Sequence, residues 1–362
     1  MKTEKIEVKM KLEDLGYDPF FDSCAEKTGV ENCILSRVIA EYKETYKVKN
    51  TQGEYLARIT GRHLFNASSR EDYPAVGDWV LLTVTDGERG VIEKVLPRKT
   101  LLRKKASGKQ ESQIIAANID VAFIVESVDR DYNLNRFERY VVLAKEEDIH
   151  PVIVLNKVDL IAENELNEMI RQINGRFGKM EVFAVSSLIG QGLATLKEFL
   201  VRGKTYCFLG SSGVGKSTLI NELLGSETIR TGDISKRTGR GKHTTTTRET
   251  YFLEKGGILI DNPGMREVGM VESHGGIEDV FGEISALSGK CRFADCTHRH
   301  EPGCAILKAL ESDELDKEKY LNYLKLKKEA DYYKMTSLEK RRKNQQFGRF
   351  KNKALKQMKE FE

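Results

Sequence analysis

The sequence predicts a multidomain protein with an N-terminal β-barrel of the OB type, a central α/β domain and a C-terminal, mostly helical domain that binds a metal. Short strand-like runs separated by turn signals fill residues 33–112. From residue 113 onward, apolar runs alternate with helical patterns, as in a parallel sheet with crossover helices. Near the C-terminus, three cysteines cluster around histidines.

Composition places the chain among ordinary globular proteins. Of its 362 residues, 40% are apolar, which is enough for two or three domains. No run approaches the roughly 18 apolar residues needed to span a bilayer, and no secretory leader is visible. We therefore expect a cytoplasmic protein with no membrane attachment. We also expect a monomer. The clustered cysteines favour a metal in a reducing compartment over disulfides.

The barrel region follows an N-terminal extension, residues 1–32, whose leucines and phenylalanines between 12 and 21 are suited to docking on a neighbouring domain. We expect strands in the barrel near residues 45–48, 54–60, 79–84 and 90–95. Barrels of this type often bind nucleic acid, so we expect RNA contact here, although many barrels bind none. Residues 98–109 carry six basic residues and no acid. This run is interpreted as a linker, which either lies on phosphate or is only a solvated connector.

The α/β part spans residues 113–275. Its expected strands are residues 121–125, 152–155, 182–185, 205–209, 250–253 and 258–260, and its expected helices lie near 136–147, 163–176, 192–202 and 216–225.

A phosphate-binding loop stands between the strand at 205–209 and the helix at 216–225, because residues 210–217 match the pattern G-x-x-x-x-G-K-[ST]. Its glycines let consecutive backbone N–H groups point at one anion, and the helix adds the positive end of its dipole. Lys216 would reach the β and γ phosphates, and the Ser217 hydroxyl would bind Mg²⁺. The predicted nucleotide contacts are Gly210, Ser211, Ser212, Gly213, Val214, Gly215, Lys216, Ser217 and Thr218.

Base recognition is predicted for Asn156, Lys157 and Asp159, which form an N-K-x-D motif after an apolar run. The Asp159 carboxylate can accept hydrogen bonds from both N1–H and the exocyclic amine of guanine, a pair of donors that adenine lacks. Asn156 would tie this loop to the phosphate loop, and the stem of Lys157 would cover the base. Ser186 and Ser187 follow the next strand, where a backbone N–H can meet the guanine O6. The expected ligands are therefore GTP and GDP.

Two segments after the phosphate loop have the character of nucleotide switches. Residues 238–247 contain no apolar side chain, and a hydroxyl of Thr244 or Thr245 would complete the Mg²⁺ shell. Asp261 and Gly264 then form a D-x-x-G motif. Asp261 would hold Mg²⁺ through a water, and the Gly264 N–H would sense the γ-phosphate.

The cysteine cluster supplies three thiolates, from Cys291, Cys296 and Cys304, and an imidazole from His298, which suffices for a closed tetrahedral zinc site with a structural role. His300 is a rival nitrogen ligand, and cysteines without a metal remain an alternative. The zinc domain would span residues 276–362. Its last 26 residues, 337–362, hold nine basic and three acidic residues, a balance suited to contact with phosphate backbones.

The base-recognition motifs stand before the phosphate loop and the switches after it, so the usual order of GTPase motifs is rotated. With the barrel in front and the Cys/His cluster behind, the chain resembles the circularly permuted bacterial GTPases that act in small ribosomal subunit maturation, over about residues 35–330. The resemblance implies GTP hydrolysis stimulated by the 30S subunit, contact with 16S rRNA, one structural Zn²⁺, Mg²⁺ with the nucleotide, and His298 as the nitrogen ligand.

The residue that orients the attacking water is not given by the usual GTPase pattern. Met265 follows Gly264, where many GTPases place a glutamine that orients the attacking water. His243 is the candidate for that task, as the resemblance also suggests; RNA binding or a solvated loop is the alternative. Arg237, Arg240 and Arg266 are candidates for charge stabilisation or for RNA contact. A non-enzymatic, guanine-nucleotide-regulated RNA-binding module is the rival function, and Asn156 and Asp159 argue against an ATPase or kinase.

Overall fold

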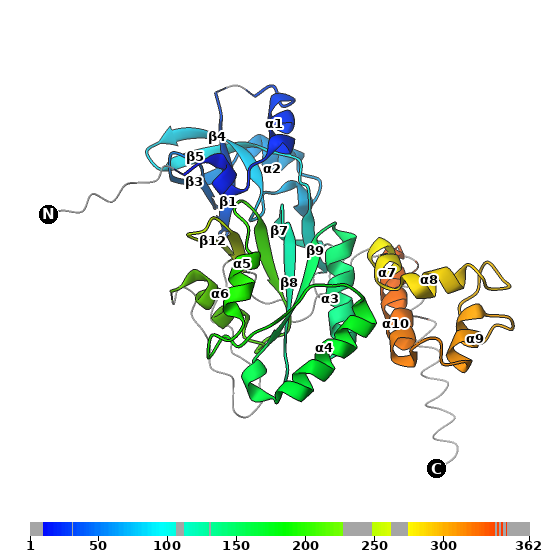
Figure 1. The fold of residues 1–362 in the computed structure, drawn as a ribbon. Helices are drawn as coiled ribbons and strands as arrows, with labels where there is room; N and C mark the ends of the chain where they lie inside the picture. Colours follow the sequence, from blue (N-terminus) through cyan, green and yellow to red (C-terminus); the bar gives the residue numbers. More distant parts are fainter. Residues whose placement is uncertain are drawn as a thin grey trace, which may run out of the picture. The chain divides into compact units, whose positions relative to one another are not determined.

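The computed structural model describes residues 10–30, 32–105, 112–129, 132–226, 248–261 and 274–336, together with residues 339, 342 and 345 (Figure 1). The chain divides into two compact units, Met1–Gly269 and Met270–Glu362. The first unit contains the barrel and the α/β part, and the second contains the Cys/His cluster. Within the described ranges, no helix is long and apolar enough to cross a membrane.

The barrel is closed. Its strands are β1 (Ile34–Glu41), β2 (Tyr46–Lys49), β3 (Glu54–Ile59), β4 (Trp79–Asp86) and β5 (Arg89–Val95). They pair in the order β1-β2-β3-β5-β4, and β4 pairs back to β1. Closure removes the free edges that would otherwise template aggregation. Alternating residues fill the interior, among them Val38, Val48, Val80, Leu82 and Ile92. The predicted barrel is confirmed. Four of its strands match the runs named from the sequence, and β1 is the fifth.

The N-terminal segment packs on the outside of this barrel. It forms the short 3-10 helix η1 (Leu12–Leu15) and α1 (Pro19–Glu26). Leu15 and Phe21 are buried against Trp79, Leu81 and neighbouring apolar side chains. Between β3 and β4 run α2 (Gly61–Asn66) and η2 (Arg70–Asp72).

The α/β part is built on β8 (Val121–Ser127), β9 (His150–Asn156), β10 (Val182–Ala184), β11 (Thr205–Leu209), β12 (Glu249–Phe252) and β13 (Ile258–Asp261). Neighbouring strands run parallel from β10 to β13, and β12 joins antiparallel to β13. All six strands match the runs that the sequence predicted. Strands of a sheet buried on both faces are continuously apolar, which makes them easy to find.

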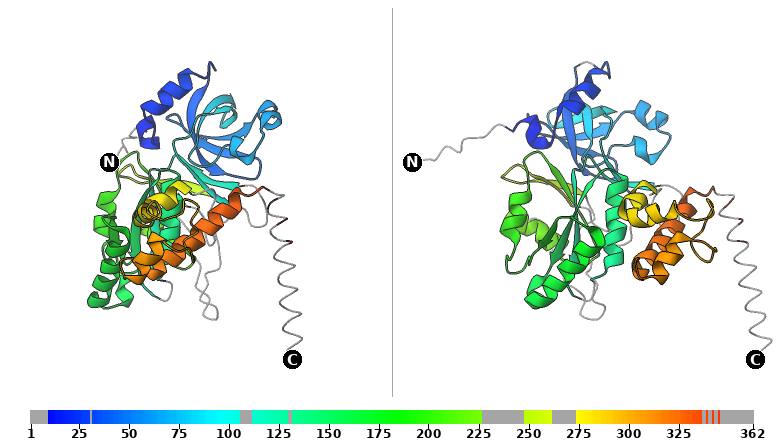
Figure 2. Two further views of the ribbon diagram at one scale, coloured as in Figure 1. Left: turned by 90° about the vertical axis from the view of Figure 1, so that its right-hand side faces the viewer. Right: turned by 45° about the vertical axis from the view of Figure 1, so that its right-hand side comes forward.

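Helices cover both faces of this sheet (Figures 1 and 2). The helices are α3 (Leu134–Glu146), α4 (Glu163–Phe177), α5 (Leu193–Phe199) and α6 (Lys216–Leu224), with a 3-10 turn η3 (Val158–Leu160) after β9. Apolar side chains of α5 and α6, such as Leu196 and Leu219, pack with Phe123 and Phe208 of the strands. α3 packs on the opposite side of β8 and β9 from α5 and α6.

The barrel and the α/β part share one sheet. β12 pairs with β1 through Ala40 and Glu249, so the described strands of both parts form a continuous order, β10-β9-β8-β11-β13-β12-β1-β2-β3-β5-β4. Arg248, just before β12, makes an ion pair with Glu41 at 3.2 Å. This pairing explains why the two parts behave as one compact unit.

The described part of the basic run, residues 98–105, is not a free linker. Residues Leu101–Lys105 form β6, which pairs with β7 (Ser112–Ala117) in a two-stranded hairpin. Arg98 binds the fully buried Asp78 at 2.7 Å, and Arg103 makes an ion pair with Glu147 at 2.8 Å. These guanidinium groups neutralise carboxylates of the protein, so they are not available for phosphate.

The buried side chain of Arg37 joins three parts of the first unit. It donates hydrogen bonds to the carbonyl of Leu15 in the N-terminal segment, to that of Asn118 before β8, and to the hydroxyl of Thr205 at the start of β11. Burial lowers the pKa of Arg37 to about 10, so the side chain remains charged at neutral pH. A cation held by neutral acceptors thus links the extension, the barrel and the α/β sheet.

The second unit is helical, as predicted. It contains α7 (His274–Val280), α8 (Gly282–Ser288), α9 (Ala305–Glu311) and α10 (Lys317–Lys334). Phe281, Ile284, Ile306 and Leu326 are fully buried and form its core. Most of the basic tail at 337–362 lies outside the described residues.

Candidate functional site

The order of the strands reverses between β8 and β11. From β8 the chain moves outward to β9 and β10, whereas from β11 it moves outward on the other side to β13. Ligands of parallel α/β sheets bind outside the carboxyl ends of the strands where the order reverses in this way. The phosphate-loop residues follow β11 and the N-K-x-D motif ends β9, so the fold gathers both at this edge.

The phosphate loop requires glycine at two of its positions. Gly210 has a φ of 146°, and a Cβ added there would lie 2.1 Å from the carbonyl oxygen of Val125. Gly215 has a φ of 94°, and its added Cβ would lie 2.3 Å from Nδ2 of Asn156. Any side chain at these positions would force the loop away from β8 and from the base-recognition loop.

Lys216 begins α6 and curls back over the loop. Its Nζ donates to the carbonyl oxygens of Gly210 at 2.8 Å and Ser211 at 2.5 Å. Ser217 and Thr218 follow in the first turn of α6 and are partly exposed. The ammonium group and the helix N-terminus therefore lie at the carboxyl edge of the sheet, where an anion is stabilised.

Asn156 ties the two loops together, as the sequence predicted. Its side chain is buried; Nδ2 donates to the carbonyl of Val214 at 2.9 Å. Its Oδ1 accepts from both the backbone N–H and the hydroxyl of Ser187, at 3.1 and 3.0 Å. One amide group thus fixes three predicted elements of the site: the N-K-x-D loop, the phosphate loop and the serine loop, in which Ser186 is also buried.

Asp159 presents a carboxylate oxygen that has no partner among the described residues. Its Oδ1 is buried and makes no hydrogen bond to any of the described residues. Leaving a buried charged acceptor unpaired is costly, so this atom fits a ligand that brings donors. Lys157 has a left-handed backbone, with φ 64°, and its Nζ lies 3.1 Å from Asp129.

Two contributions to the site lack a sequence signal. Tyr140 of α3 hydrogen-bonds Ser211 of the phosphate loop, and burial raises the pKa of this tyrosine to about 12, so it stays protonated. Asp129 follows β8 and faces Lys157. Tyr140 and Asp129 both act through contacts between different elements of the fold. A local sequence pattern does not predict such contacts.

Asp261 ends β13, which pairs with β11, so its carboxylate lies at the same edge of the sheet as the phosphate loop. It is 5% exposed. The other predicted switch and catalytic positions fall outside the described residues: Arg237, Arg240, His243, Thr244, Thr245, Gly264, Met265 and Arg266.

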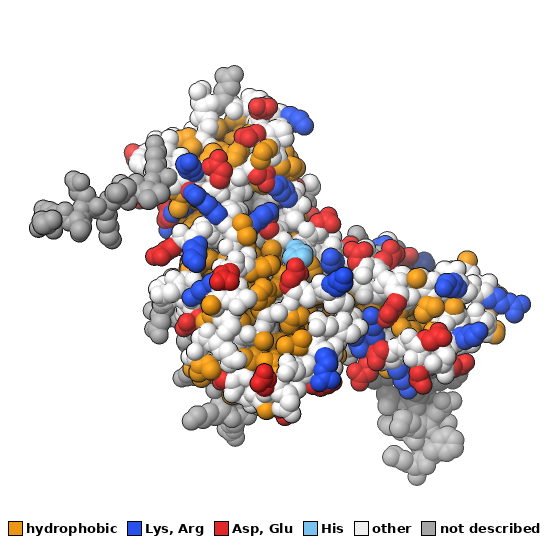
Figure 3. Space-filling view, in the orientation of Figure 1, with side chains coloured by type: hydrophobic (Ala, Val, Ile, Leu, Met, Phe, Trp, Pro, Cys, Tyr) orange, Lys and Arg blue, Asp and Glu red, His pale blue; other side chains and the backbone are white. Residues whose placement is uncertain are grey.

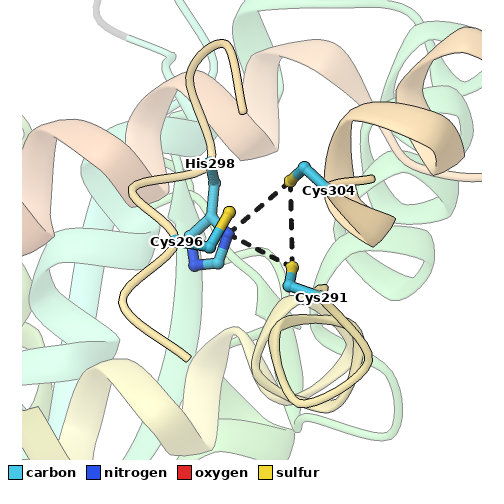
Figure 4. Close-up of side chains that lie close together, drawn as sticks. All are labelled: Cys291, Cys296, His298 and Cys304. Carbon is cyan, nitrogen blue, oxygen red and sulfur yellow. Dashed lines mark hydrogen bonds between the residues drawn. The ribbon is translucent and has the colours of Figure 1, made fainter. Parts of the chain in front are cut away.

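The second unit brings Cys291, Cys296, His298 and Cys304 together (Figure 4). One ligand atom from each lies within 4.8 Å of all the others. Cys291 and Cys304 have their sulfurs 3.8 Å apart, and these sulfurs lie 3.6 and 3.7 Å from Nδ1 of His298. Tetrahedral zinc with ordinary bond lengths requires about 3.8 Å between two sulfurs and about 3.6 Å between sulfur and nitrogen. The donor set and its spacing therefore fit Zn²⁺.

His298, not His300, faces this cluster. His298 is 4% exposed and adopts a left-handed backbone with φ 63°, whereas His300 is exposed. Tyr320 of α10 donates to the carbonyl of His298 at 2.5 Å. Burial lowers the pKa of His298, which favours the neutral imidazole that a metal requires. The carboxylate of Glu301 accepts from the backbone N–H groups of Thr297 and Arg299, which fixes the loop on both sides of the histidine.

Known proteins share this architecture. The family model described as RsgA GTPase matches residues 95–271. A small ribosomal subunit biogenesis GTPase RsgA from Leptospira interrogans is 40% identical over 349 residues, covering 95% of this chain and 95% of that protein. Another, from Bacteroides thetaiotaomicron, is 40% identical over 86% of this chain and 87% of its own length.

Solved structures agree. The crystal structure of YjeQ from Thermotoga maritima matches with a TM-score of 0.60 and 28% identity, covering 82% of this chain and 98% of that one. The structure of YloQ, a circularly permuted GTPase, has a TM-score of 0.57 at 23% identity, covers 85% of this chain and 99% of its own, and so supports the fold. This chain belongs to the RsgA family of GTPases.

Proposed function

We propose that this chain binds GTP with Mg²⁺, hydrolyses it to GDP and phosphate, and acts in biogenesis of the small ribosomal subunit. As an RsgA GTPase it is a GTP-hydrolysing P-loop enzyme, and relatives named for small ribosomal subunit biogenesis match most of its length. The single observation that carries the base assignment is the buried Asp159 Oδ1, which has no partner among the described residues. Guanine would supply its missing donors through N1–H and the exocyclic amine.

The nucleotide would lie along this edge of the sheet, from Asp159 to Lys216. The backbone N–H groups of residues 210–218 would bind the phosphates, with Lys216 exchanging its carbonyl partners for phosphate oxygens. Asn156 holds the base loop against the phosphate loop and also binds the Ser187 N–H. A backbone N–H of the loop that contains Ser187 would donate to the guanine O6. The stem of Lys157 would cover one face of the base.

Magnesium would be held by oxygen atoms at the same edge of the sheet. Ser217 offers a hydroxyl and Asp261 a carboxylate, which are the donors that Mg²⁺ prefers. Thr244, Thr245 and Gly264, outside the described residues, are proposed to complete the switch contacts. The ion would neutralise charge on the β and γ phosphates during transfer. His243 is proposed to orient the attacking water, because the neighbouring sequence offers Met265 where a glutamine is common.

Zinc would have a structural role. The four ligands Cys291, Cys296, His298 and Cys304 fill a tetrahedral shell, which leaves no position for a catalytic water. The metal would hold the loop before α9 in a fixed shape.

The small ribosomal subunit and its 16S rRNA are the proposed partners. On the face drawn in Figure 3, basic and acidic side chains are interspersed over both units, so that face has no broad patch of basic side chains. A local set on the barrel fits RNA better. Leu56 of β3 pairs with Arg89 of β5, and Leu56, Arg58 and Arg89 are all exposed. Such a strand face is where OB-type barrels bind oligonucleotides.

We propose that each domain, with the boundaries predicted from the sequence, has its own function. Residues 1–32 form an extension, 33–112 an RNA-binding barrel, 113–275 the GTPase domain, and 276–362 a zinc domain with a basic tail. We also propose that the protein is a cytoplasmic monomer and that 30S subunits stimulate its hydrolysis during late maturation.

The base assignment is tested by Asp159→Asn. An amide in place of the carboxylate can donate to the C2 carbonyl of xanthine but cannot accept from both guanine donors. We expect the wild-type protein to bind GDP in strong preference to xanthosine and adenosine diphosphates, and the variant to prefer xanthosine diphosphate. A variant that keeps its preference for GDP would remove Asp159 from the base site.

A further inference from the structure

Lys157 of the N-K-x-D motif is held by a carboxylate that lies outside the motif. Its Nζ lies 3.1 Å from Oδ2 of Asp129. The other oxygen of Asp129, Oδ1, accepts a hydrogen bond of 2.7 Å from the hydroxyl of Ser127. The Lys157 and Asp129 side chains are 23% and 29% exposed, so a ligand can reach the pair.

The position of Asp129 is fixed by the sheet. Ser127, at the end of β8, pairs with Asn156 of β9, and the backbone N–H of Val128 donates to the Asn156 carbonyl at 3.1 Å. On its other side, β8 pairs with β11, which leads into the phosphate loop. Asp129 therefore emerges from the strand that separates the base-recognition loop from the phosphate loop.

The backbone of Lys157 also restricts its side chain. Its left-handed conformation, with φ 64°, starts the four-carbon stem from a fixed direction between Asn156 and Val158. A free lysine samples many rotamers, and ordering it when a ligand binds weakens binding. The ion pair with Asp129 orders the stem in the absence of the ligand, which is a form of preorganisation.

We propose that Asp129, braced by Ser127, is a positioning residue that holds the Lys157 stem in place to cover the guanine base, and that it thereby sets the affinity for guanosine di- and triphosphates. The inference rests on the proposed function, because it assumes that the base lies against Lys157. Asp129 acts through the lysine and is not required to touch the nucleotide.

The test measures the affinity and dissociation rate of a fluorescent GDP analogue on the full-length protein. We expect Asp129→Asn to weaken binding about fivefold, mainly through faster dissociation, because a partly exposed ion pair has a modest effect. Asp129→Glu, which retains the charge, should restore most of the affinity. The matched control is Glu168→Gln, which breaks the exposed pair with Arg171 on α4 and should leave binding unchanged.

A double-mutant cycle separates positioning from a general structural effect. If Asp129 acts through Lys157, adding Asp129→Asn to a Lys157→Ala protein should cause no further loss of affinity. An equal loss in both backgrounds, or no loss in the wild-type background, would overturn the proposal. The wild-type protein is also tested with an ADP analogue. If it bound ADP as well as GDP, the proposed base site itself would fail, whereas a guanine-selective wild type with an unaffected Asp129→Asn variant would refute only the positioning role.

Discussion

Replacing Arg37 tests how the extension, the barrel and the α/β sheet are joined. In Arg37→Met the carbonyls of Leu15 and Asn118 lose the donor that the guanidinium provides, and so does the hydroxyl of Thr205. The Gly77 carbonyl, which accepts from Nε of Arg37 at 3.2 Å, keeps a second donor, Nδ2 of Asn118. Methionine has a similar length, so the change removes hydrogen bonds and charge with little change in packing volume.

The size of the effect follows from two opposing contributions. Two buried carbonyls left without donors cost about 2–6 kcal/mol together. Removing the cation recovers part of its desolvation penalty; the fall of its pKa from 12.5 to about 10 corresponds to about 3 kcal/mol. We expect the free energy of unfolding of the Arg37→Met variant to be about 2 kcal/mol lower than that of the wild type. This difference lowers the Tm of a unit of this size by about 5 °C.

Lysine at this position makes the test sharper. Arg37→Lys retains the buried charge but loses the planar fork that reaches several acceptors at once. It should therefore destabilise the protein at least as much as Arg37→Met, although it is the more conservative change by charge. Differential scanning calorimetry measures both variants, with Arg62→Met on the exposed surface of α2 as the control. Tm values within about 1 °C of the wild type for both variants would refute the role of Arg37 as a joint.

Three further predictions concern the site, the metal and pH. Asn156→Ala should weaken GDP binding by at least about tenfold, because it separates the base and phosphate loops; calorimetric titration measures this, and unchanged affinity would contradict it. Elemental analysis should find one zinc per chain, lost in His298→Ala and retained in His300→Ala, and the reverse result would reassign the ligand. Burial raises the pKa values of Tyr46 and Tyr140 to about 12. Their contribution to stability is therefore complete below pH 10, where unfolded tyrosine titrates, and is lost as pH rises toward 12. Ultraviolet absorbance should show these phenols ionising only as the protein unfolds, and ionisation near pH 10 in the folded state would be inconsistent.

The strands and the phosphate loop could be read from the sequence because their signals are local. A strand such as β11 is apolar throughout because both faces of the sheet are covered, and the glycine pattern that follows it reflects the backbone of a single loop. The tie made by Asn156 was also predictable, because the motif implies that its loop meets the phosphate loop.

Pairings between distant segments could not be read in this way. The run at 98–109 suggested free positive charge, but Asp78 neutralises Arg98 from 20 residues earlier in the chain. Similarly, nothing near Arg37 reveals that its partners come from the extension and from β11. The pairing of β1 with β12 was also not predictable from the sequence, because an edge strand can pair with any exposed neighbour that the fold brings to it.

The measurement that tests the central claim most directly is phosphate release from GTP and ATP, with purified 30S subunits absent and then present. The account predicts release from GTP alone, stimulated by 30S subunits, and loss of that stimulation in His243→Ala with GDP binding retained. Release that is equal for ATP and GTP would contradict the base site. Release from GTP that 30S subunits do not change would contradict the proposed ribosomal partner and leave only the nucleotide and metal sites.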